Sequence, residues 1–516
     1  MDNQLKLTWA LPPTWLRFLI IVLLVLGVFF RFVNLDKKVY WYDETLTSLT
    51  ISGFTKDELY QQVFNGSEVG VEDLLKYQYP NPEKGLIDTV SSLSLDSPEH
   101  PPFYFIMARF WVQLFGNSVA VTRSLSAVIS LLAFPCIYWL CLELFESPLV
   151  GWIAIALIAV SPFHVLYAQE AREYSLWIVT ILLSSAALLQ AIRLKTKIGW
   201  VIYAVTVVVS LYTYLFSALV LIGHGLYVAI TASWRLNKTT LSYLFASVVG
   251  VVIFTPWFFF ILAHHSSMSW TAEKISWLDM VKIWVLNLIH VFLDIKFNLN
   301  NPLTYLIPFI LILVGYSIYF LYRNATKQAF VFIFTLMGVT ALALLLPDII
   351  KGGRWSSVAR YLTPFYLGIQ IAVVYLLANK IKFYVNNKQR KIGRVAIILL
   401  FSCGVLSCAT SSQAEGWWNK FHNSQNAQIA RMINQADSPL VISDSSHGDI
   451  LSLSHLLDNK VRFQLVIEPK IPKIVDGFSD TFLFSPSKTL LSGLQINHND
   501  TIKPIYKRKL WKVVKN

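Results

Sequence analysis

Residues 16–32, which read LRFLIIVLLVLGVFFRF, decide the class of fold to which this chain belongs. As a helix, this stretch is long enough to cross a hydrocarbon core of about 30 Å. It is longer than the apolar core of a signal peptide, and no small-residue cleavage site follows it. We therefore expect it to remain in the protein as the first spanning helix.

The composition extends this prediction to the rest of the chain. Of 516 residues, 55% are hydrophobic and 14% are charged, and the mean hydropathy is +0.53. Such a chain is too apolar for an ordinary soluble globule. Its apolar runs predict an α-helical polytopic membrane protein with about 11 transmembrane helices, at 16–32, 119–144, 150–167, 175–192, 199–215, 217–233, 242–262, 303–321, 329–346, 361–378 and 394–411.

The connections between these runs carry an asymmetric charge. Lys and Arg gather in alternate short loops, at 193–197, 235–238, 323–327 and 380–394. This positive-inside pattern predicts a multi-pass protein of the plasma (inner) membrane with a cytoplasmic N-terminus. It also explains the net charge of +13 through topology, so no nucleic-acid partner is expected.

If the N-terminus is cytoplasmic, the alternating direction of the spans places three long segments on the outer side of the membrane, at 33–118, 263–302 and beyond 411. Within the first, the short apolar run 103–115 predicts a helix on the membrane surface. We predict a transmembrane domain over 1–411, which includes the outer loop 33–118, and an extracytoplasmic domain over 412–516.

The composition of the tail is that of a small soluble α/β domain. Strand-like runs at 440–442, 462–466 and 482–484 alternate with helical stretches at 423–435 and 449–457. Its His447, Asp449 and His455 are more readily explained as surface polar residues than as a site.

Charged and polar residues recur at the outer ends of the predicted spans. They are Asp43 and Glu44, Glu99 and His100, Arg123, Glu170 and Arg172, and Arg360 with Tyr361. Each has a plain structural explanation, such as a helix cap for Asp43 or a headgroup contact for Arg123. Together, carboxylates and arginines on one face suit an enzyme that binds a phosphate while it takes a proton from an acceptor.

Five motifs in a fixed order resemble one known family. They are Asp43-Glu44, His100-Pro101-Pro102, Arg123-Ser124-Leu125-Ser126-Ala127, the stretch from Ser161-Pro162-Phe163-His164 to Gln169-Glu170-Ala171-Arg172, and Arg360-Tyr361-Leu362-Thr363-Pro364. Over about 16–375 the chain resembles the C-class glycosyltransferases of family 39, which include protein O-mannosyltransferases and lipid A aminoarabinose transferases. The tail beyond 411 lies outside this resemblance.

The resemblance implies that a sugar moves from a polyprenyl-phosphate carrier to an acceptor outside the membrane. Asp43, paired with Glu44, would then be the general base, and Arg123 would hold the carrier phosphate. Because a hydroxyl is a poor nucleophile at neutral pH, a carboxylate base is worth about 10²–10⁴ in rate. The leaving phosphate needs fixed cations, for which Arg172 and Arg360, with Tyr361, are further candidates.

The remaining polar residues are compatible with several cofactors and acceptors. Glu44, Glu99, His100 and Glu170 could position the acceptor or sugar, or hold a divalent ion such as Mg²⁺, Mn²⁺ or Zn²⁺. The protein mannosyltransferases carry a folded insert in the later outer loop, for which 263–302 has no room. This departure weakens the case for a protein acceptor, so glycan, lipid and protein acceptors all stay open.

Three other functions compete with this one. A lipid-linked sugar transporter or flippase would carry charges near the bilayer centre and show paired inverted halves. A membrane-anchored sensor would leave Asp43, Arg123 and Glu170 unexplained. An oligosaccharide polymerase or ligase would differ mainly in substrate. The enzyme hypothesis requires that the acids after the first span and Arg123 share one outer pocket.

Overall fold

The computed structural model describes residues 12–264, 273–297, 300–382, 387–498 and 501–514. These residues fold into two compact units. The bundle unit comprises Met1–Val33, Glu99–Phe103 and Arg123–Ser412, and the sheet unit comprises Asn34–Pro98, Tyr104–Thr122 and Gln413–Asn516.

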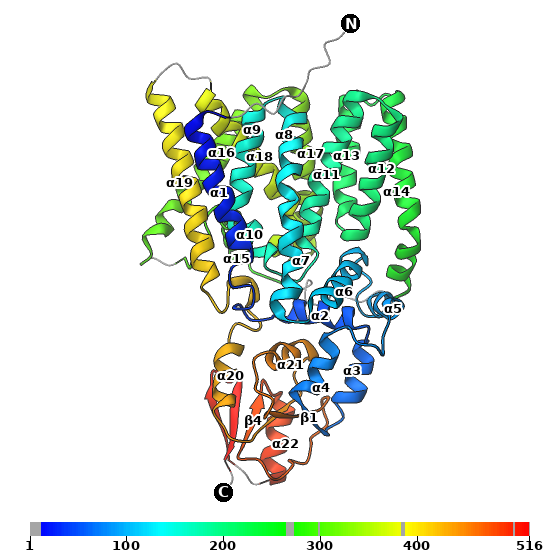
Figure 1. Ribbon diagram of the computed structural model, residues 1–516, viewed down its shortest axis with the longest axis vertical. Helices are drawn as coiled ribbons and strands as arrows, with labels where there is room; N and C mark the ends of the chain where they lie inside the picture. Colours follow the sequence, from blue (N-terminus) through cyan, green and yellow to red (C-terminus); the bar gives the residue numbers. More distant parts are fainter. Residues whose placement is uncertain (1–11, 265–272, 298–299, 383–386, 499–500, 515–516) are drawn as a thin grey trace. The chain divides into compact units, whose positions relative to one another are not determined.

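The bundle unit is helical (Figure 1). Its helices are α1 (Thr14–Phe32), α7 (Val119–Leu131), α8 (Ala133–Phe145), α9 (Pro148–Val160), α10 (Pro162–Ala168), α11 (Tyr174–Leu194), α12 (Lys197–Thr213), α13 (Ser217–Thr231), α14 (Lys238–Ala263), α15 (Trp277–Ile289), α16 (Ile307–Asn324), α17 (Lys327–Lys351), α18 (Thr363–Lys382) and α19 (Asn387–Ser412). The first four residues of α7 belong to the sheet unit.

The predicted membrane class is confirmed. Within the described residues, eight helices are long and apolar enough to cross a bilayer, or nine if the bent pair α9–α10 is one span. The two remaining predicted spans, 199–215 and 217–233, correspond to α12 and α13. These have 17 and 15 residues, somewhat fewer than the roughly 20 that a crossing takes.

The predicted span 150–167 is broken in the structure. Pro162 begins α10, which is bent by 58° from α9. Proline disfavours a helical residue before it, and Ser161 is accordingly extended, with φ −67° and ψ 122°. The break matters for function because it leads directly into the polar connection 169–173.

The sheet unit is built on a mixed sheet of six strands in the order β1-β3-β2-β4-β6-β5 (Figure 1). The strands are β1 (Glu68–Gly70), β2 (Pro439–Ser443), β3 (Arg462–Leu465), β4 (Asp480–Phe484), β5 (Thr501–Tyr506) and β6 (Leu510–Val514). The central strand β2 is parallel to β3 and β4, while β1, β5 and β6 pair in antiparallel fashion. The strands and short helices predicted for 412–516 are thereby found.

Helices of the same unit lie on both faces of this sheet. The helices of the unit are α2 (Tyr42–Ser52), α3 (Lys56–Val63), α4 (Val71–Leu75), α5 (Leu86–Asp96), α6 (Phe103–Phe115), α20 (Asn426–Asn434), α21 (His447–Ser454) and α22 (Lys488–His498). Alternate residues of β2 point to opposite faces, so that Val441 joins one core with α3, α20 and α21, while Leu440 and Ile442 join another with α22. Parallel strands that are buried on both sides explain the continuous apolar runs in the sequence.

The grouping of segments differs from the predicted division at 411. The first outer loop packs with the tail, since β1 pairs with β3 and the side chains of Leu59 and Val63 share a core with Ile429 and Ile450. A loop of this length would expose those apolar groups if it stood alone. We therefore describe 34–98 and the tail as parts of one folded body.

Candidate functional site

A buried polar loop joins α10 to α11 in the bundle unit. Gln169 and Ala171 are almost fully buried, as are the charged side chains of Glu170, Arg172 and Glu173. Burial of charges inside a helical bundle is costly unless they are paired, so such a loop is a candidate site.

The loop is tied to two neighbouring helices. The Gln169 side chain donates from Nε2 to the carbonyl oxygens of Phe30 (2.8 Å) and Val33 (3.0 Å) at the end of α1. The Ser126 hydroxyl of α7 donates to the carbonyl oxygen of Arg172 at 3.1 Å. These bonds fix the backbone that carries the charged side chains.

Three charged or titratable side chains form a compact group at this loop. The His100 Nδ1 lies 2.8 Å from Oε1 of Glu173, and Arg172 donates from Nη2 to His100 Nε2 at 3.1 Å. Because a guanidinium can only donate, His100 Nε2 accepts and its Nδ1–H donates to Glu173. Burial alone would raise the pKa of Glu173, but Arg172 and then His100 outweigh it and lower that pKa to about 2.

Two of the predicted phosphate-binding arginines share one aromatic ring. The guanidinium carbon of Arg172 lies 5.8 Å from the ring centre of Tyr174, and that of Arg360 lies 5.4 Å from the same ring centre. Arg360 also lies 5.4 Å from the ring centre of Tyr361. Cation–π contacts hold these positive charges near one another, where they can attract an anion.

Tyr214, at the end of α12, links these groups. Its ring centre lies 6.1 Å from that of Tyr174 and 6.4 Å from that of His100. Glu173 and Arg360 also lie within its electrostatic range. The structure thus brings together His100, Arg172, Arg360 and Tyr361 of the predicted set.

The other predicted residues of the bundle unit lie around this group. Arg123 is fully buried on α7, one helical turn before Ser126. Glu170 is fully buried, and both it and Arg360 lie within electrostatic range of Tyr167. Glu99 is half-buried directly before His100.

The predicted acids Asp43 and Glu44 begin α2 in the sheet unit. Glu44 is fully buried, and its Oε2 accepts hydrogen bonds from Lys420 Nζ at 2.8 Å and from the backbone N–H of Trp41 at 3.2 Å. Asp43 is half-buried in the first turn, where the exposed N–H groups of a helix favour a carboxylate. The two neighbouring acids therefore have different environments.

The tail histidines were predicted as surface residues, and for His447 this prediction is wrong. His447 is only 6% exposed, and its Nδ1 is hydrogen-bonded to the Tyr60 hydroxyl at 2.9 Å. Burial, and then the charge of Lys56, lower the pKa of His447 to about 4. His455 is partly buried, and its Nε2 contacts Gln78 Oε1 at 3.3 Å.

No group of three His, Cys, Asp or Glu side chains suited to a metal ion occurs in the part of the chain that the structure describes. Dependence on a divalent ion stays a prediction.

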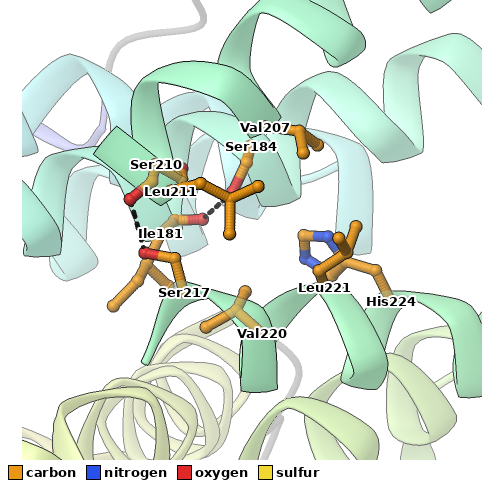
Figure 2. Close-up of a pocket in the computed structure, with 9 residues that line it drawn as sticks. All are labelled: Ile181, Ser184, Val207, Ser210, Leu211, Ser217, Val220, Leu221 and His224. Carbon is orange, nitrogen blue, oxygen red and sulfur yellow. Dashed lines mark hydrogen bonds between the residues drawn. The ribbon is translucent and has the colours of Figure 1, made fainter. Parts of the chain in front are cut away.

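A small cavity inside the bundle unit contains none of the predicted residues. Figure 2 shows His224 and the hydroxyls of Ser184, Ser210 and Ser217 around it. The space open to the centre of a water molecule is about 10 Å³, enough for about one water. A sugar or a lipid does not fit there.

Sequence reasoning assigned no site role to Glu173, Tyr174, Tyr214 or Lys420. Glu173 and Tyr174 adjoin the predicted Arg172, so their proximity was available from the chain order. Tyr214 follows an apolar run and Lys420 lies 376 residues from Glu44, so no local pattern could mark either one.

One family model matches part of the chain. Residues 99–260 match the family model described as dolichyl-phosphate-mannose-protein mannosyltransferase, a range that includes His100, Arg123 and Arg172. No protein of curated function matches the sequence.

Two solved structures, both of ArnT, share the fold. Two structures of ArnT from Cupriavidus metallidurans, one bound to undecaprenyl phosphate and one in the apo state, each have a TM-score of 0.55, 13% identity and 97% coverage of both chains. The oligosaccharyltransferase from Archaeoglobus fulgidus has a TM-score of 0.48 and 12% identity, over 90% of this chain and 65% of that chain.

The fold and the family match together define an integral membrane protein with the C-class glycosyltransferase fold and support a glycosyltransferase. Within that class, the chain resembles ArnT and the protein O-mannosyltransferases, as its sequence motifs predicted.

Proposed function

We propose that this protein transfers a sugar from a polyprenyl-phosphate carrier to an acceptor hydroxyl at the outer face of the membrane, with inversion at the sugar carbon. One observation carries the proposal: two guanidinium groups, of Arg172 and Arg360, lie against the single ring of Tyr174. Paired cations at the start of α11, a helix long enough to cross a bilayer, suit a lipid-linked phosphate. The bound undecaprenyl phosphate of the ArnT structure supports the same donor class.

The reaction is a single displacement. The acceptor oxygen forms a bond to the anomeric carbon of the sugar, and Asp43 takes the acceptor proton. The bond between that carbon and the phosphate oxygen breaks on the opposite face, and polyprenyl phosphate leaves. Arg172 and Arg360, with Arg123 and Tyr361 as further candidates, stabilise the negative charge that develops on it.

The remaining predicted residues take supporting roles in this proposal. Glu173 and His100 fix the guanidinium of Arg172, because their hydrogen bonds restrict its position. Glu170 and Glu99 are proposed to position the sugar or the acceptor. Glu44, which is already bonded to Lys420, is assigned to positioning rather than to proton transfer.

The charge pattern of the loops supports the topology. A cytoplasmic N-terminus in the inner membrane would place the first outer loop and the tail on the extracytoplasmic side. That Asp43 and the arginines act in one pocket stays a prediction, because they belong to different units. The proposed acceptor is a glycan, a lipid or a protein.

Reconstitution of the purified protein into liposomes tests the proposal. With a panel of polyprenyl-phosphate sugars and an envelope-lipid extract as acceptor, we expect sugar transfer and release of polyprenyl phosphate, followed by mass spectrometry. Asp43→Asn should lose at least about 10² in rate. Asp36→Asn, an exposed acid of the same loop, is the matched control. Wild-type rates in Asp43→Asn would defeat the assignment of the base.

A flippase, the main competing function, predicts a different result. It would move the lipid-linked sugar across the liposome bilayer without releasing the carrier phosphate. Movement without release in the same liposomes would favour the flippase. Transfer that stops on addition of EDTA and returns with one cation would establish the predicted metal.

A further inference from the structure

We propose that the C-terminal tail positions the general base through two residues, Lys420 and Asn423, which fix the first turn of α2. The proposal rests on the function proposed above for Asp43, and it gives the tail a specific role in that reaction. Every contact used below lies within the sheet unit.

The first turn of α2 is capped by side chains from outside its N-cap position. The N-cap residue is Trp41, and its backbone N–H donates to Oε2 of Glu44 at 3.2 Å. The first N–H groups of a helix have no partner within the helix and need an acceptor from elsewhere. Residues such as Ser, Thr, Asp and Asn normally supply that acceptor at the N-cap itself.

The tail supplies one acceptor from 381 residues away. The backbone N–H of Tyr42 donates to Oδ1 of Asn423 at 2.8 Å. Asn423 is fully buried and is itself held, because its Nδ2 donates to Oδ1 of Asp449 at 2.9 Å. The Ser446 hydroxyl donates to the other oxygen of Asp449 at 2.8 Å. The cap of α2 is therefore anchored in the first turn of α21.

Lys420 fixes the second acceptor. Its Nζ lies 2.8 Å from Oε2 of Glu44, the same oxygen that accepts the Trp41 N–H, and the side chains of Lys420 and Glu44 are 1% and 0% exposed. The ammonium also lies 5.5 Å from the ring centre of Trp41. Removal of Lys420 would take away the ammonium group that lies against this buried carboxylate, and the loss of such a partner favours movement or protonation of the carboxylate.

Close packing adds to this restraint. A Cβ on Gly448 would lie 2.5 Å from the ring of Tyr42, so the start of α21 can approach α2 only because this residue is glycine. The Thr45 hydroxyl donates to the Tyr42 carbonyl oxygen at 2.7 Å. Asp43 lies between Tyr42 and Glu44, the two residues that the tail holds, so its backbone cannot shift without breaking these contacts.

A shift of about 1 Å in a catalytic group can cost about 10² in rate. We therefore expect variants of the tail contacts to lower kcat while the affinity for the donor is kept. A residue that merely supports folding would instead lower the amount of folded protein and leave the kcat of the folded fraction unchanged.

The test compares Lys420→Met with Lys420→Arg in reconstituted protein. Lys420→Met should lower kcat at least tenfold, with the KM for the donor within twofold of wild type. Lys420→Arg keeps a positive charge that can donate to Glu44, so its kcat should stay within about threefold of wild type. Lys460→Met, an exposed lysine of the tail, is the matched control.

Asn423→Ala provides a second, independent variant, with the same expected loss of kcat at unchanged donor KM. The proposal is overturned if folded Lys420→Met and Asn423→Ala both keep wild-type kcat, or if Lys420→Arg is as impaired as Lys420→Met. These outcomes are separable from the failure of the proposed base, which an active Asp43→Asn variant would reveal on its own.

Discussion

At the scale of single residues, the candidate donor site depends on how Tyr174 orders two like charges. Arg172 and Arg360 carry like charges, and the negative face of the tyrosine ring offsets part of their repulsion. His100 and Glu173 also hold Arg172 in place.

Tyr174→Leu should therefore weaken donor binding. Loss of two cation–π contacts, each worth about 1 kcal/mol, should raise the KM for the lipid-linked sugar about 5- to 30-fold. Tyr174→Phe keeps the ring and should stay within about twofold of wild type. Steady-state kinetics with a polyprenyl-phosphate donor checks this, and equal KM values for the Leu and Phe variants would contradict it.

His447 predicts a dependence of stability on pH. Burial, and then Lys56, lower its pKa from 6.5 to about 4, so between these values the unfolded chain binds a proton that the folded protein does not. Stability is complete above about pH 6.5 and falls as the pH is lowered towards 4. By linkage, the loss approaches about 3 kcal/mol. Thermal unfolding of wild type and His447→Gln from pH 4 to 7 should show a weaker pH dependence in the variant, and parallel curves would contradict the prediction.

At the scale of elements, the break between α9 and α10 is stabilised by Arg31 of α1. This fully buried guanidinium donates to the carbonyl oxygens of Ala159 (2.6 Å) and Ile158 (3.0 Å) at the end of α9, and to the Ser130 hydroxyl (3.0 Å). Carbonyls at a helix end otherwise lack partners. Arg31 thus permits the bend that leads into the polar loop 169–173.

Arg31→Met should destabilise the bundle unit by about 3 kcal/mol, because it leaves two buried carbonyls unsatisfied. The thermal unfolding midpoint in detergent is the measurement. Arg17→Met, an exposed arginine on the same helix, provides the comparison and should leave that midpoint nearly unchanged. A midpoint for Arg31→Met equal to that of the Arg17 variant would show that the cap contributes little.

At the scale of elements, local sequence patterns predicted the helices of the bundle unit and three strands of the sheet. Apolar length identified the helices of the bundle unit, and short strand-like apolar runs identified β2, β3 and β4. The three-residue strand β1 was too short for any periodic signal, so its pairing with β3 could not be anticipated. The break at Pro162 had a local signal, yet the continuous hydropathy of 150–167 outweighed it.

At the scale of the whole molecule, residues far apart in the sequence come into contact, and no local sequence pattern predicted some of these contacts. Arg172, Arg360 and Tyr361 were expected to bind one phosphate because of their residue types and motifs, and they do converge. Lys420 and Asn423 were not expected at α2, since tertiary packing alone pairs them with Glu44 and Tyr42. The same packing joins the first loop and the tail into the sheet unit.

The central claim is that the paired arginines hold the phosphate of a lipid carrier. Binding of undecaprenyl phosphate to the purified protein, followed by native mass spectrometry, tests it most directly. Wild type should bind the lipid, and Arg172→Gln/Arg360→Gln should bind at least about tenfold more weakly, since two charge-assisted contacts are lost. Undiminished affinity in a folded double variant would contradict the claim.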